Sequence, residues 1–299
     1  MDNKKEILID TDIGDDIDDA LALALALRSP ELNLLAVTTV FKNTAERAKL
    51  AHALLKKYNR TDIPVYEGIA MPMVNEVSIK DIPCQCAAIE DDDYVKRDEH
   101  AIDVIIDTVK AYPALTILAI GPLTNIALAI LKAPEVMAKA NIVLMGGAFG
   151  TTEPEWNIFC DPEAASVVFR SGANIKAIGL DVTTRCTLSK ENEAVAKACE
   201  AEEAAFLMKL FAAWHKASGY GITLHDPLII GAIINPKLVR YEERKIVIEL
   251  RGENTRGATI VKQSFFKTFE TPNAAIATSV ESEEFVDFFM KRVFPNPLQ

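Results

Sequence analysis

The sequence lacks the features that mark nucleic-acid-binding, membrane and secreted proteins. Its 299 residues contain 32 Lys and Arg against 43 Asp and Glu, so a net charge of −11 leaves no basic stripe for phosphate contacts. No apolar run is long enough to cross a bilayer. The opening residues, MDNKKEILID, lead at once into a predicted strand and leave no room for a signal peptide. We therefore expect no nucleic-acid partner and no membrane association.

The cysteines do not form the pattern of a disulfide framework or a zinc site. Their number is odd and their spacing irregular, since they stand at Cys84, Cys86, Cys160, Cys186 and Cys199. Cys84 and Cys86 have no nearby histidine and no second cysteine pair, which argues against zinc. Reduced thiols of this kind are typical of the cytosol. Together with the missing signal peptide, they predict a cytoplasmic protein.

Strand and helix patterns alternate along most of the chain. Apolar runs that predict strands lie at 7–9, 32–40, near Val65, and at 115–121, 141–147, 173–182, 244–250 and 257–263. Helical patterns lie at 19–28, 43–58, 100–112, 123–131, from Asp161-Pro162 onward, and at 189–218, 225–234 and 281–293. This order predicts one α/β domain over residues 1–299, with an open, mainly parallel central sheet flanked by helices. Residues 68–98 lose the alternation and predict a long loop beside the site.

The stretch with the most unusual chemistry is residues 5–20, where an apolar strand runs into six aspartates. These are Asp10, Asp12, Asp15, Asp16, Asp18 and Asp19. Carboxylates this close repel one another and raise each other's pKa values, so a divalent cation is the natural way to keep several of them ionised. An all-oxygen ligand set favours calcium or magnesium over zinc. Capping of the following helix accounts for one or two of the six, but not for all.

Polar residues and glycines also follow the ends of other predicted strands. In a parallel sheet these ends lie along one edge, so residues distant in sequence converge on one crevice. The residues expected there from strand ends, loops and helix starts are Asn43, Ile120, Gly121, Met145, Glu155, Asn157, His225 and Asp226. The set is rich in carboxylates and amides and poor in lysine and arginine. It suits a neutral polyhydroxylated ligand such as a sugar better than a phosphate.

Several segments together resemble the inosine-uridine-preferring nucleoside hydrolase family. They are DTDIG at 10–14 with DDA at 18–20, GPLTNIA at 121–127, MGG at 145–147, EWN at 155–157 with DPEAA at 161–165, and LHDPL at 224–228. They follow the family's order and approximate spacing over about residues 5–235. The resemblance implies a calcium-dependent enzyme that hydrolyses the N-glycosidic bond of a ribonucleoside to free base and ribose. It also implies a homodimer or homotetramer.

The resemblance implies a role for each site residue. The implied calcium ligands are Asp12, Asp19, the carbonyl of Ile120, and Asp226. Asp12 is also the implied general base for the attacking water, and His225 lies near the leaving base. The residues implied to contact the ribose are Asp18, Asn43, Met145, Glu155 and Asn157. This layout suits the chemistry, because cleavage builds positive charge on the ribose ring and nearby carboxylates stabilise that charge.

The acidic turn departs from the commonest family pattern. Asp15-Asp16-Ile17 separate Gly14 from Asp18-Asp19, so it stays open whether Asp16 replaces Asp18 or Asp19 at the metal or the ribose. The preference for purine or pyrimidine depends on variable loops, chiefly 68–98 and 206–224, and does not transfer from the resemblance.

Two other functions fit the opening motif taken alone. One is a magnesium-dependent phosphatase that uses the first aspartate of the D-x-D strand end as its nucleophile. It requires a lysine and a later acidic pair at strand ends, where this chain has glycines and amides instead. The other is a calcium-stabilised sugar-binding protein without catalysis, which has no need of Asp12 beside a water molecule. Release of ribose distinguishes the hydrolase from both alternatives.

Overall fold

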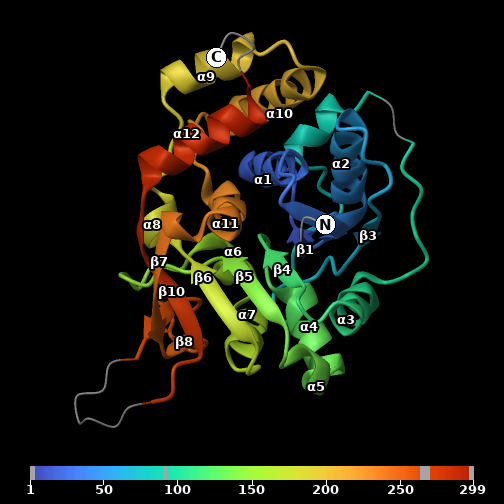
Figure 1. The fold of residues 1–299 in the computed structure, drawn as a ribbon. Helices are drawn as coiled ribbons and strands as arrows, with labels where there is room; N and C mark the ends of the chain where they lie inside the picture. The colour runs from blue at the N-terminus through green and yellow to red at the C-terminus, as the bar shows by residue number, and fades with distance from the viewer. Residues whose placement is uncertain (1–3, 91–92, 263–269, 296–299) are drawn as a thin grey trace.

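The core of the protein is a sheet whose order places the first strand at its centre. The computed structural model describes residues 4–90, 93–262 and 270–295, and within these ranges the sheet has eight strands in the order β3-β2-β1-β4-β5-β6-β10-β7 (Figure 1). Neighbouring strands are parallel except β10 and β7. The strands are β1 Lys5–Thr11, β2 Leu32–Thr39, β3 Val65–Glu67, β4 Thr116–Ala119, β5 Asn141–Met145, β6 Asn174–Ile178, β7 Val239–Arg244 and β10 Ala274–Val280. A separate antiparallel pair consists of β8 Ile246–Ile248 and β9 Thr259–Val261.

Helices cover both faces of the sheet, because its central strands present apolar side chains to both sides. On β1, Ile7 and Ile9 belong to one core cluster, whereas Leu8 belongs to the other. The first layer contains α1 Asp18–Leu27, α2 Thr44–Lys57, α8 Leu180–Thr183, α9 Lys190–Ala198, α10 Glu202–Ser218, α11 His225–Ile234 and α12 Ser282–Val293. The second contains α3 Ala101–Ala111, α4 Thr124–Lys132, α5 Pro134–Met137, α6 Trp156–Cys160 and α7 Pro162–Phe169. The 3₁₀ helices are η1 Cys84–Ala88 and η2 Pro236–Leu238.

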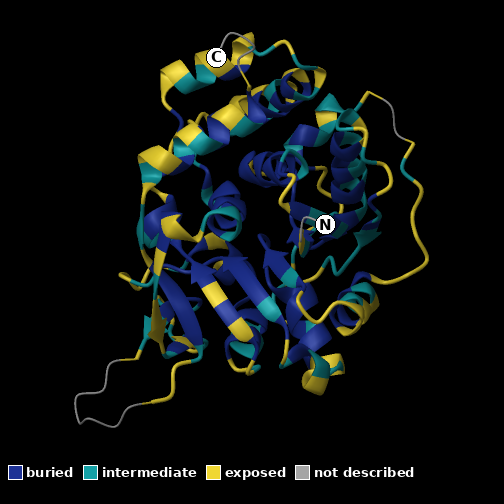
Figure 2. Ribbon diagram, viewed as in Figure 1, coloured by how far each residue is buried: buried dark blue, intermediate teal, exposed yellow. Residues whose placement is uncertain are grey.

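Two helices of the first layer, α1 and α11, have hardly any exposed surface. Helix α1 reads DDALALALAL and is buried from Asp18 to Ala26, and α11 is buried from Asp226 to Ala232. Figure 2 shows both helices mostly as buried, whereas α9, α10 and α12 present exposed faces to solvent. A helix that is apolar on all sides belongs in the interior. The two helices pack against each other, and both begin above the same edge of the sheet.

The order of strands reverses between β1 and β4, which creates a crevice at their carboxyl ends. Strands β2 and β3 extend the sheet on one side of β1, and β4, β5 and β6 extend it on the other. Such a switch point is where open α/β sheets bind ligands. Gly121, just after β4, lies against Asp12, and a Cβ there would come within 2.8 Å of the Asp12 backbone nitrogen and Oδ1. Only glycine allows this approach.

The predicted fold class is confirmed, and the main errors lie in the last third of the chain. The strands predicted at 244–250 and 257–263 shorten to β8 and β9, which form the separate pair instead of joining the main sheet. Strands β7 and β10 were not predicted. The sequence of β7, VRYEER, is polar because β7 is an exposed edge, and β10, AAIATSV, is rich in alanine, which favours helix over strand.

Smaller corrections concern element boundaries in the middle of the chain. The strand predicted at 173–182 ends at Ile178, and its last residues belong to α8. The helical pattern at 189–218 divides into α9 and α10. The five cysteines are free thiols, as predicted. Among the described residues, no helix combines the length and apolar content needed to span a bilayer.

Candidate active site

A cavity of about 430 Å³ opens above the carboxyl ends of β1, β4 and β5. Every residue to which the resemblance gives a role lines it except Asn43, and Asp16 lines it too; the lining residues of this set are Asp12, Asp16, Asp18, Asp19, Ile120, Met145, Glu155, Asn157, His225 and Asp226. Four further residues line it as well, namely Asp15, Lys42, Trp156 and Leu180. Residues from seven separate parts of the chain thus share one cavity at the predicted edge of the sheet.

Asn43 is the predicted residue that the structure leaves outside this lining. Its side-chain oxygen caps α2 by accepting a hydrogen bond from the backbone nitrogen of Glu46 at 3.3 Å. The preceding residues Phe41 and Lys42 have φ values of 68° and 56°, which is rare for residues other than glycine. Lys42 lines the cavity in its place, with its Nζ 3.5 Å from Oδ2 of Asp15. No sequence motif indicated this lysine.

Three buried carboxylates meet where α1 and α11 begin. One oxygen from each of Asp18, Asp19 and Asp226 lies within 4.8 Å of the others. The backbone nitrogen of Asp226 donates to Asp18 Oδ2 at 3.2 Å, and Thr11 Oγ1 donates to Asp19 Oδ1 at 2.5 Å. Two helix N-termini also favour negative charge at this point. Three buried carboxylate oxygens at this spacing fit a hard divalent metal ion.

The protonation of this cluster follows from its burial. Burial raises the pKa values of Asp18, Asp19 and Asp226 well above the ordinary range, and their mutual repulsion raises these values further. Burial also raises the pKa of Asp12 to about 6, although the guanidinium of Arg47 opposes this shift. Without a cation these groups therefore hold their protons to higher pH than exposed aspartates do. A bound cation would instead keep them ionised.

Glu155 and Asn157 are held rigidly at the start of α6. The Glu155 carboxylate accepts hydrogen bonds from the backbone nitrogens of Asn157 at 2.8 Å, Gly147 at 3.1 Å and Ile158 at 3.2 Å. Burial nevertheless raises the pKa of Glu155 to about 7. The Asn157 amide donates to the carbonyl oxygens of Ile120 at 3.0 Å and Met145 at 3.2 Å. These bonds fix the orientation of both side chains at the cavity wall.

His225 connects this cavity to a second one. Its Nδ1 lies 2.8 Å from the hydroxyl of Thr183, so Nε2 is the ring nitrogen that this contact does not use. Burial lowers the pKa of His225 to about 4, so the imidazole is neutral at neutral pH. The second cavity, of about 420 Å³, shares Asp16 and His225 with the first and is also lined by Trp214 and Tyr220. The two cavities therefore adjoin at Asp16 and His225.

Comparison with known proteins gives one family over nearly the whole chain. Residues 7–287 match the inosine-uridine preferring nucleoside hydrolase family. The pyrimidine-specific ribonucleoside hydrolase RihA of Escherichia coli strain K12 is 35% identical over 306 residues, which cover 96% of this chain and 97% of RihA.

Two solved structures are similar in both fold and sequence. A plant nucleoside hydrolase has a TM-score of 0.88 at 28% identity and covers 98% of this chain and 99% of its own. A purine-preferring ribonucleoside hydrolase from Gardnerella vaginalis has a TM-score of 0.85 at 30% identity, with coverages of 97% and 98%. The similarity thus includes the whole sheet and both helical layers.

Proposed function

The chain belongs to the inosine-uridine preferring nucleoside hydrolase family, and from this premise we propose that its acidic cavity is a calcium-dependent N-ribohydrolase site. Hydrolysis of ribonucleosides follows from the family and from relatives that match over nearly their full length. The observation that supports a hard metal ion is the buried trio Asp18, Asp19 and Asp226, of which Asp19 and Asp226 are the proposed ligands and Asp18 lies beside them. Calcium accepts several carboxylate oxygens in a flexible geometry, whereas magnesium keeps more of its water.

We assign the metal and ribose roles to Asp18 and Asp19 rather than to the inserted aspartates. Asp18 and Asp19 are buried, whereas Asp15 and Asp16 are exposed on the rim of the cavity. We propose that Asp19 and Asp226 hold the ion together with Asp12 and the carbonyl of Ile120. That carbonyl accepts a hydrogen bond from Asn157 and has a second lone pair available. Asp18 then serves the ribose hydroxyls.

The remaining residues divide the chemistry of cleavage among them. A bound calcium ion would lower the pKa of a water molecule and hold the ribose diol. Asp12 accepts the proton of that water, and the bound cation would keep its carboxylate ionised and able to do so. The water attacks C1′ on the face opposite the base. Glu155 and the neighbouring carboxylates stabilise the positive charge that develops on the ribose ring.

We propose that neutral His225 donates a hydrogen bond from Nε2 to the departing base. This role requires the tautomer in which Nδ1 accepts from the Thr183 hydroxyl, 2.8 Å away, and Nε2 carries the hydrogen. His225→Ala is expected to lower kcat on nucleosides by roughly 10²-fold and to have little effect on a 4-nitrophenyl riboside, whose leaving group is a stable anion. Rate assays on both substrates test this, with His100→Ala, at the start of α3 and outside both cavity linings, as the control. An equal loss on both substrates would contradict the role.

We propose that the second cavity receives the nucleobase, since it begins at His225 and contains the aromatic residues Trp214 and Tyr220. Relatives of similar identity differ in base preference, because RihA is pyrimidine-specific and the Gardnerella enzyme is purine-preferring. A substrate panel therefore needs both classes of base.

The panel that tests the proposed function consists of inosine, adenosine, guanosine, uridine and cytidine, with 4-nitrophenyl phosphate as a phosphomonoester. We expect free ribose from at least one nucleoside and no release of phosphate, since the described cavity lining offers only Lys42 as a cation and Lys42 is close to Asp15. Phosphate release without ribose would favour the phosphatase. Binding of nucleosides without any cleavage would favour the sugar-binding protein.

A further inference from the structure

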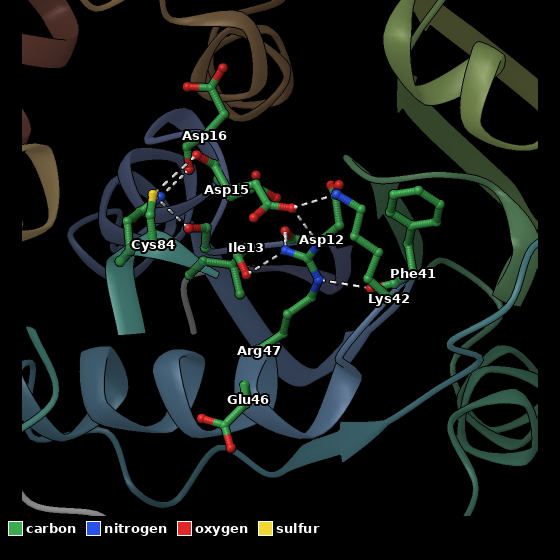
Figure 3. A network of polar contacts seen from close by, with 12 residues as sticks. Asp12, Ile13, Asp15, Asp16, Phe41, Lys42, Glu46, Arg47 and Cys84 are labelled. Carbon is green, nitrogen blue, oxygen red and sulfur yellow. Dashed lines mark hydrogen bonds and ion pairs between the residues drawn. The ribbon is translucent and has the colours of Figure 1, made fainter. Parts of the chain in front are cut away.

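Arg47, on α2, is a fully buried cation directly behind the acidic turn. Figure 3 shows its guanidinium pointing from the helix into the loop between Asp12 and Asp15. Its Nε donates to the carbonyl oxygen of Phe41 at 2.8 Å. Nη1 donates to the carbonyl oxygens of Asp12 and of Ile13, the latter at 2.9 Å, and Nη2 contacts the Asp15 carboxylate at 2.8 Å. All three guanidinium nitrogens thus donate hydrogen bonds, either to the acidic turn or to the carbonyl oxygen of Phe41.

Gln85, on η1, supports the same turn from a second element and is also fully buried. Its backbone nitrogen donates to the Gly14 carbonyl oxygen at 3.2 Å, and its Nε2 donates to the carbonyl oxygen of Asp16. Gly14 has a φ of 125° and lies against Pro83, so a side chain there would collide with the proline ring. The carbonyl groups from Asp12 to Asp16 are therefore held from outside the cavity by α2 and η1.

Arg47 supports the acidic turn electrostatically as well as by packing. A buried guanidinium needs a compensating negative charge, and its one carboxylate partner, Asp15, has a side chain that is 44% exposed. The other carboxylates of the acidic turn supply the remaining negative charge. The positive charge of Arg47 in return weakens the repulsion around Asp12. Neither Arg47 nor Gln85 reaches the cavity. Their effect on the ion must pass through the backbone of the turn.

We propose that Arg47 and Gln85 are positioning residues for the metal site, which hold the turn from Asp12 to Asp16 so that its carboxylates are arranged before the ion binds. This inference rests on the proposed metal site. Residues that support metal ligands typically change metal affinity by roughly 10- to 100-fold when they are replaced. Three residues, 15–17, separate Gly14 from Asp18 where the commonest family pattern has one, and this longer turn has more need of such support.

The test measures calcium affinity of the full chain by titration calorimetry after removal of bound cations, with circular dichroism to show that each variant is folded. Arg47→Met is expected to raise the Kd for Ca²⁺ by roughly 10- to 100-fold. Arg47→Lys should give a smaller increase, because lysine keeps the charge but loses the planar set of donors. Arg28→Met is the control, since Arg28 pairs with Glu203 at the far end of α1, and its Kd should match the wild type.

The outcomes separate this inference from the proposed function. A wild-type chain that binds no calcium overturns both. Wild-type affinity in a folded Arg47→Met variant overturns only the positioning role, even if its melting temperature falls, because a merely structural residue would lower stability alone. If Arg47→Met does not fold, Gln85→Met decides, since it removes one side-chain donor. Its Kd should rise by roughly tenfold, and an unchanged Kd overturns the inference.

Discussion

Asp12→Asn is expected to lower kcat by roughly 10³-fold on every ribonucleoside that the wild-type protein cleaves. The amide has nearly the shape of the carboxylate but cannot accept the proton of the attacking water. The fold should survive, because the contact of Asp12 with Arg47 uses its backbone carbonyl rather than its side chain. Single-turnover assays of ribose release at saturating substrate measure the loss directly.

Two controls separate the proton-transfer role of Asp12 from a role in holding the ion. If Asp12 only binds calcium, excess calcium should restore kcat in the variant, whereas a lost base cannot be restored in this way. Glu46→Gln is the matched control, because Figure 3 shows the Glu46 carboxylate pointing away from the acidic turn, and its turnover should equal that of the wild type. Wild-type turnover in Asp12→Asn would refute the proposed base.

Removal of divalent cations is expected to abolish turnover and to make stability depend on pH. The aspartate trio loses its countercharge when the ion leaves, and the ribose diol loses a ligand. Activity after dialysis against a chelator, then with added Ca²⁺ or Mg²⁺ in separate samples, tests the first part. Recovery with calcium at concentrations where magnesium has no effect would support the proposed ion. Full turnover in the presence of chelator would refute a metal-dependent mechanism.

The direction of the pH effect follows from the raised pKa values. In the metal-free protein the folded state binds protons more tightly than the unfolded chain, whose aspartates titrate at about 3.9. Stability from these groups is therefore present at low pH and is lost as pH rises through about 6 for Asp12 and about 7 for Asp10 and Glu155. Calcium binds the ionised form of its carboxylate ligands and so offsets the part of this loss that comes from Asp12.

Thermal unfolding with and without calcium, at pH 5 and pH 8, measures this coupling. Calcium at 100 times its Kd should stabilise the folded state by about 2.7 kcal/mol. Because protons compete with the ion, the gain in melting temperature from a fixed calcium concentration should be larger at pH 8. An equal gain at both pH values would mean that the buried carboxylates do not titrate in this range.

The parts of the site that could be predicted from sequence are those that depend on strand order. Parallel strands bring their carboxyl ends to one edge, so Asp12, Ile120 and Met145 could be placed together before any coordinates were known. Lys42 could not, because its position depends on two consecutive positive φ values that no local pattern indicates. Arg47 and Gln85 are similar cases, since their partners are backbone carbonyls and leave no trace in sequence spacing.

The fold shows the same division between local patterns and tertiary context. Buried strands such as β1 and β5 have continuous apolar sequences and were predicted within a few residues. Strand β10 was missed because its alanines and serine have little strand preference, and its place between β6 and β7 depends on neighbours far away in the chain. The long segment 68–98 was expected beside the site, and Gln85 contacts the acidic turn from it.

The meeting of α1 and α11 also limits when the protein can acquire its ion during synthesis. In the folded protein the backbone nitrogen of Asp226 donates to the Asp18 carboxylate, yet the two residues are 208 positions apart in the chain. A ribosome delivers the first well before the second, so the nascent chain carries an acid-rich segment with no cation to neutralise it for most of translation. Fragments that end before α11 should bind the ion poorly, because they lack Asp226.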